Sequence, residues 1–141
     1  MAIKKQEFYE GAAIHRLACF GGLKSVTFEK PFFLFNNQIL VYFKYSTKNR
    51  SPWGFTFTPE EQRLLKAKEK DTKIVIGLVC GFDGVAAVGS AEILKIGVAE
   101  DSSIRIACFR KHGEYYKVSG PDGELSKKVA PSDWTRLLGA L

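Results

Sequence analysis

Residues 23–48 read LKSVTFEKPFFLFNNQILVYFKYSTK and are rich in β-branched and aromatic side chains. Side chains of these types fit the pleated surface of a sheet. Asn36-Asn37 interrupts the run, and asparagine tolerates the positive φ angles that a two-residue hairpin turn requires. The stretch therefore predicts an antiparallel hairpin whose cross-strand pairs are Phe35–Gln38, Phe33–Leu40, Pro31–Tyr42 and Glu29–Lys44.

Helical patterns lie on both sides of this hairpin. Residues 5–19 carry an apolar stripe at helical spacing, and the glycine pair 21–22 follows as a stop signal. After the hairpin, Thr58 is a suitable N-cap, Pro59 suits the first helical position, and Glu61 completes a capping box. The sequence therefore predicts one helix before the hairpin and a second helix that begins at Thr58.

A continuous apolar run, Ile74 to Cys80, follows the second helix. A run without alternation is typical of a strand that is buried on both faces. Asp83-Gly84 predicts a tight turn into a further strand, and we expect Ser90 to cap a short helix after it. Two alternating strands and a final helix with Trp134 on its apolar face complete the chain. This order predicts an α/β or α+β fold, in which helices flank a mixed β-sheet that contains the antiparallel hairpin.

The composition is that of a folded soluble protein. The chain has 141 residues, so we expect a single domain that spans 1–141. Apolar runs are too short for a membrane helix, and the first residues lack the pattern of a secretory signal. The three cysteines are odd in number and widely spaced, which predicts neither a zinc ligand pair nor a disulfide framework. These features predict a cytoplasmic protein with no membrane partner.

The charge balance favours an anionic partner. Lysine and arginine number 21 against 15 acidic residues, which gives a net charge of +6. Excess positive charge favours binding to nucleic acid through long-range electrostatic attraction and through the release of counterions. Lys48 and Arg50 lie in a basic segment that ends at Trp53, and aromatic rings beside cations suit base stacking. We therefore expect Lys48, Arg50 and Trp53 to contact nucleic acid, with the alternative that Trp53 covers the hairpin core.

The order helix, antiparallel strands, helix and buried strand over residues 7–80 resembles the core of the restriction-endonuclease-like, PD-(D/E)XK superfamily. In the segment ILVYFKYSTK, residues 39–48, Lys44 stands at the position of the lysine of the family motif. Glu29 lies near the position of the first acid, and Glu10 is similar to a helix acid that some members add. The resemblance implies a metal-dependent nuclease, in which Glu29 and Glu10 hold Mg²⁺ and Lys44 helps to position or activate the attacking water.

Tyr42 stands where the family places the acid two residues before its lysine. The element order, Lys44 and the basic loop to Arg50 favour a protein that binds or processes nucleic acid, DNA before RNA, on a nuclease-like scaffold, and Tyr42 leaves open whether the site cuts. The missing acid motivates an alternative from another class, a non-catalytic interaction module that regulates a partner protein. An unpaired ammonium inside an apolar strand is costly. We therefore expect Lys44 to reach Glu29, Glu10 or water at the end of the sheet.

Overall fold

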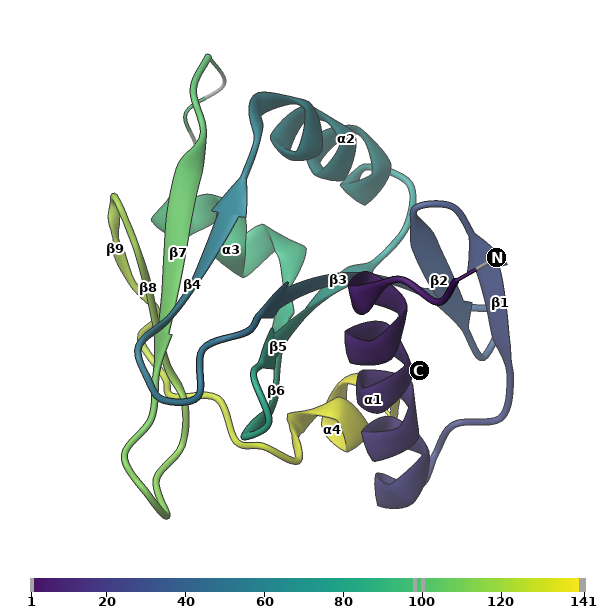
Figure 1. Ribbon diagram of the computed structural model, residues 1–141. Coiled ribbons are helices and arrows are strands. Elements are labelled where there is room, and N and C mark those ends of the chain that lie inside the picture. The colour runs from purple at the N-terminus through teal and green to yellow at the C-terminus, as the bar shows by residue number, and fades with distance from the viewer. Residues whose placement is uncertain (1, 98, 100, 140–141) are drawn as a thin grey trace.

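A computed structural model describes residues 2–97, 99 and 101–139, and within them the chain forms two sheets and four helices (Figure 1). The first sheet contains β1 (Val26–Glu29), β2 (Phe32–Phe35), β3 (Ile39–Ser46), β5 (Ile74–Cys80) and β6 (Gly84–Gly89). The second sheet contains β4 (Trp53–Phe57), β7 (Ile104–Phe109), β8 (Lys117–Gly120) and β9 (Gly123–Glu124). The helices are α1 (Lys5–Phe20), α2 (Pro59–Glu69), α3 (Ser90–Ile96) and α4 (Asp133–Gly139).

The first sheet is mixed and has the strand order β1-β2-β3-β5-β6. Strands β3 and β5 are parallel, whereas the other neighbouring pairs are antiparallel. A parallel pair requires a long crossover, and here the connection runs through β4 and α2. The expected fold class, a mixed sheet with an antiparallel hairpin flanked by helices, is therefore confirmed. Strand β5 is an interior strand with every residue buried, as its continuous apolar sequence predicts.

The two faces of the first sheet pack against different elements, because successive side chains of a strand point to opposite faces. One face of β3, with Leu40 and Tyr42, packs in a hydrophobic cluster with α2, α3 and the second sheet. The other face, with Val41 and Phe43, packs with α1 and α4, and Trp134 lies in this cluster. Figure 1 shows α1 and α4 on one side of β3 and the second sheet on the other. Lys44 has the same parity as Tyr42 and therefore points toward α2.

The register of the β2–β3 hairpin differs from the expected register by one residue. The observed partners are Phe35–Ile39, Leu34–Leu40 and Phe33–Val41. Asn36 and Asn37 do adopt positive φ angles, of 54° and 56°, but Gln38 is also part of the turn, and its backbone N–H donates to the carbonyl of Phe35. The Asn36 side chain binds the backbone of Gly22, Lys24 and Ser25, so contacts outside the hairpin help to set the turn.

The expected pairing of Glu29 with Lys44 is wrong. The stretch before Asn36 folds into two strands, β1 and β2, which turn at Lys30-Pro31, and Glu29 pairs with Phe32. Pro31 lies in that turn, where its missing N–H does not interrupt a ladder of hydrogen bonds. Glu29 is exposed at the end of β1, two strands away from β3.

The two helix starts after the hairpin have different outcomes. At α2 both halves of the capping box form between Thr58 and Glu61, as expected. At α3 the N-cap is Gly89, and no side chain caps the helix. Ser90 is instead the first helical residue, and its buried hydroxyl has no hydrogen-bond partner among the described residues. The cap that we expect at Ser90 is therefore wrong.

No helix in the described part of the chain is long and apolar enough to cross a membrane.

Candidate functional site

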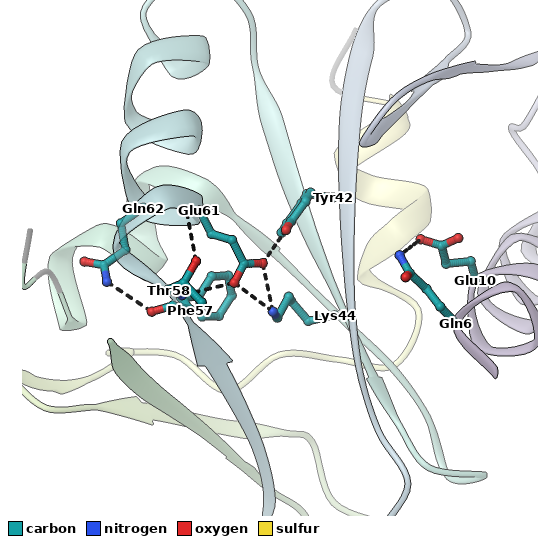
Figure 2. Close-up of polar contacts among 8 residues, drawn as sticks. All are labelled: Gln6, Glu10, Tyr42, Lys44, Phe57, Thr58, Glu61 and Gln62. Carbon is teal, nitrogen blue, oxygen red and sulfur yellow. Dashed lines mark hydrogen bonds and ion pairs between the residues drawn. The ribbon is translucent and has the colours of Figure 1, made fainter. Parts of the chain in front are cut away.

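Lys44 points from β3 toward the first turn of α2, where it meets Glu61 (Figure 2). Lys44 Nζ donates to Glu61 Oε1 at 3.1 Å and to Oε2 at 2.8 Å, and the Tyr42 hydroxyl donates to Oε2. The Lys44 and Glu61 side chains are only 20% and 18% exposed. The expectation that Lys44 reaches a carboxylate is confirmed, but neither Glu29 nor Glu10 is the partner.

The position of Glu61 follows from its place in the capping box. Its Oε1 accepts a hydrogen bond of 3.0 Å from the backbone N–H of Thr58, while its own N–H donates to the Thr58 hydroxyl at 3.2 Å. The carboxylate that caps α2 therefore also receives Lys44 and Tyr42 from β3. Lys44 Nζ lies 5.2 Å from the centre of the Phe57 ring, at the end of β4. Four side chains thus tie β3, β4 and α2 together.

Burial and hydrogen bonding set the protonation of this group. Burial alone raises the pKa of Glu61, but hydrogen bonds from Lys44, the Thr58 backbone and Tyr42 outweigh it and lower the pKa below its ordinary value of 4.5. Burial, together with the hydrogen bond to Glu61, raises the pKa of Tyr42. The lowered pKa keeps the Glu61 carboxylate ionised at neutral pH, and the raised pKa keeps the Tyr42 phenol protonated.

The two other acids expected at Lys44 lie elsewhere. Glu10 is on α1, across the sheet from Lys44, where the Gln6 amide donates to its Oε2 at 3.0 Å and burial raises its pKa (Figure 2). Glu29 lies on the outer strand β1. The structure therefore does not bring Glu10, Glu29 and Lys44 together.

The donor set at Lys44 does not fit the Mg²⁺ that the resemblance implies. A divalent metal of this type needs several oxygen ligands. Among the residues that the structure describes, Glu61 is the carboxylate that Lys44 binds, and it already accepts hydrogen bonds from three groups. Among the described residues, no group of three or more His, Cys, Asp or Glu side chains is arranged to hold a metal ion.

The basic segment forms the loop 47–52 between β3 and β4, in which Lys48 and Arg50 are exposed. Trp53, by contrast, begins β4 and is only 2% exposed. Its indole N–H donates to the Lys48 carbonyl at 3.0 Å, and its ring packs against Tyr116. Trp53 therefore covers the core and holds the loop, which is the alternative left open above, and it offers no free face for a base.

The structure adds a residue that the sequence analysis missed. The loop 47–52 packs against the turn between β5 and β6, where the Gly81 N–H donates to the Ser46 carbonyl at 3.0 Å. Gly81 has a φ of +54°, and the Lys48 carbonyl lies so close to it that a Cβ atom would clash. The next residue, Phe82, is 86% exposed. The sequence does contain a signal for Phe82, because an aromatic residue in a turn between two glycines is expected to be exposed.

None of the protein-family models, curated proteins and solved structures that were searched matches this chain. Two local arrangements of side chains bear on function. One is the partly buried group around Lys44 and Glu61. The other is the exposed surface where the loop 47–52 meets Phe82.

Proposed function

We propose that the protein binds nucleic acid through the surface around the loop 47–52, without cutting it at Lys44. The observation that carries the proposal is the packing of this loop, with exposed Lys48 and Arg50, against the turn that exposes Phe82. Cations bind phosphates with release of counterions, and an exposed aromatic ring offers a face on which a base can stack. The net charge of +6 adds a long-range attraction for the same partner.

The scaffold is part of this proposal. The chain order is α1, antiparallel β1 to β3, β4, α2 and β5, and apart from β4, which pairs in the second sheet, it follows the element order on which the resemblance to the PD-(D/E)XK superfamily rests. We propose a nuclease-like scaffold in which the lysine of the motif serves the fold. Support comes from the pairing of Lys44 with Glu61, in which the ammonium donates to both oxygens of the carboxylate.

The role of Lys44 is tested by the substitution Lys44→Met, which keeps most of the apolar stem. We expect a loss of about 1 to 3 kcal/mol in the free energy of unfolding, because the partly buried Glu61 carboxylate loses a charged hydrogen-bond donor. With Mg²⁺ or Mn²⁺ present, we also expect the wild type to cut no more plasmid or single-stranded DNA than the Lys44→Met variant does. Cutting by the wild type that disappears in a folded Lys44→Met variant would contradict the proposal.

The role of the loop is tested by the double variant Lys48→Ala/Arg50→Ala. Fluorescence anisotropy with labelled DNA and RNA, at a series of salt concentrations, gives the affinity and its salt dependence. We expect weaker binding and a log–log salt slope that is flatter by roughly one unit for each lost phosphate contact. The matched control is Lys24→Ala/Lys30→Ala, which removes two exposed cations beside the outer strand β1 and leaves the loop unchanged.

Each outcome of this comparison has a clear meaning. If the loop variant binds DNA and RNA as tightly as wild type, the loop is not the binding surface and the proposal fails. If the control variant weakens binding as much as the loop variant, charge alone explains the affinity. If the wild type binds no nucleic acid near physiological salt, the result favours the alternative, a module that regulates a partner protein.

A further inference from the structure

A groove with a volume of about 550 Å³ lies between α1 and the β5–β6 hairpin. Pockets of roughly 300–1,000 Å³ are the usual size of ligand sites. Small residues, among them Ala12 on α1 and Gly84 at the start of β6, line this groove and leave its interior open. The groove lies beside the surface proposed above, because Gly81 and Phe82 line it as well.

Two exposed aromatic rings border the groove from separate elements. Phe8 of α1 is 63% exposed and Phe82 of the hairpin turn is 86% exposed. Large apolar side chains that gather at an exposed hollow indicate a site of interaction. Neither ring is needed to fill the core, since both lie outside the two hydrophobic clusters of the fold.

The charge at the groove is positive. Among the described residues that line it, Lys5 and Arg16 are cationic and none is acidic. Their positions on α1 are separated by three turns of helix, about 16 Å along its axis. The nearby carboxylate of Asp83 is already paired with Arg110, on the side of the second sheet. An anion with several charges along its length can therefore contact both cations of α1.

We propose that this groove binds the unpaired bases of a single-stranded nucleic acid, an inference that rests on the proposed nucleic-acid function. Phe8 and Phe82 stack on bases, and Lys5 and Arg16 contact phosphates on either side. Stacking platforms flanked by cations suit single strands, whose base faces are free, whereas the faces of paired bases are covered inside a duplex. Lys48 of the loop 47–52, whose backbone carbonyl packs against Gly81, adds an exposed cation to the loop beside the turn that carries Phe82.

The test compares a fluorescein-labelled oligothymidylate with a duplex of equal length. We expect the wild type to prefer the single strand, and Phe82→Leu and Phe8→Leu each to weaken single-strand binding by roughly 5- to 100-fold, because leucine keeps an apolar side chain but offers no ring. Duplex binding should change less than about twofold in these variants, since stacking on unpaired bases does not contribute to it. Phe82→Tyr restores the ring and should restore single-strand affinity. Phe28→Leu is the matched control, because Phe28 is 60% exposed on β1, outside the groove.

The results separate this inference from the proposed function. If Phe8→Leu binds the single strand like wild type while Phe82→Leu and Lys48→Ala/Arg50→Ala both bind it weakly, the groove inference is wrong and the loop proposal stands. If the wild type binds neither probe, both fail. Binding of dodecanoate to the wild type without any binding of the oligonucleotide would overturn the inference in favour of an acyl-chain ligand.

Discussion

Glu61 accepts hydrogen bonds from the ammonium of Lys44, the hydroxyl of Tyr42 and the backbone of Thr58. Each donor favours the ionised carboxylate, and together they overcome the cost of its burial. The same side chain is therefore the cap of a helix and the counter-ion of a lysine in a strand. A residue with two structural roles is sensitive to any change in its charge.

The lowered pKa of Glu61 makes the stability of the fold depend on pH. Because the pKa is lower in the folded state than its ordinary value of 4.5, ionised Glu61 stabilises the fold above that value, and this contribution is lost as the pH falls through the folded pKa. We expect Glu61→Gln to reduce the loss of stability between pH 6 and roughly pH 3. Urea unfolding of wild type and Glu61→Gln across this pH range measures the loss in the free energy of unfolding for each protein. An equal loss in wild type and variant would contradict the assignment.

At the scale of single elements, the start of α2 has the clearest local signal. Thr58, Pro59 and Glu61 lie within four consecutive residues, and the hydrogen bonds that they form are local. A hydroxyl at the N-cap satisfies a backbone N–H that would otherwise lack an intrahelical partner. This start is thus encoded before any tertiary contact forms.

Replacement of Thr58 by alanine tests the contribution of this cap. We expect Thr58→Ala to lower the free energy of unfolding by about 1 kcal/mol, because the Glu61 N–H loses its acceptor. Thr58→Ser keeps the hydroxyl and should retain most of the stability. Urea midpoints of the three proteins give the comparison, and an unchanged midpoint for Thr58→Ala would show that the capping bond contributes nothing.

The β2–β3 hairpin shows where local signals end. Asn36-Asn37 correctly marks the turn, since both residues have positive φ. The pairing register, however, depends on the Asn36 side chain, which binds the chain at residues 22–25. A contact between segments more than ten residues apart is not visible in the pattern of the hairpin itself.

At the scale of the whole molecule, a second polar group joins the two sheets. Asp83, in the turn after β5, accepts a hydrogen bond of 2.7 Å from the hydroxyl of Tyr116 and lies 3.2 Å from Nε of Arg110. Arg110 and Tyr116 lie between β7 and β8 of the second sheet, and the guanidinium also stacks over the Tyr116 ring at 5.0 Å. This group holds the turn that presents Phe82.

Removal of the Asp83 carboxylate should therefore weaken the junction of the sheets. We expect Asp83→Ala to destabilise the protein by about 2 kcal/mol, because the Tyr116 hydroxyl and Arg110 both lose a charged acceptor. Glu124→Ala is the control, since it removes an ion pair with Lys117 that is half exposed, and should cost under about 1 kcal/mol. Thermal unfolding measures both. Equal losses would mean that Asp83 does not contribute to the junction.

The amino-acid sequence by itself determined the elements whose signals are local. The capping box at Thr58, the continuous apolar strand Ile74–Cys80 and the glycine stop after α1 were all predictable, because neighbouring residues set backbone conformation and burial pattern. The mixed sheet followed from the order of these elements. The position of Lys44 in an apolar strand also predicts that its ammonium reaches a carboxylate or water.

Only the tertiary structure decided which residues meet. Glu61 reaches Lys44 because α2 crosses from β3 to β5 on the face to which even-numbered side chains of β3 point, whereas α1 with Glu10 covers the other face. Phe82 lies beside the loop 47–52 because parallel pairing brings the ends of β3 and β5 to the same edge of the sheet. These contacts depend on the hand and register of strand pairing, which residues distant in the sequence set together.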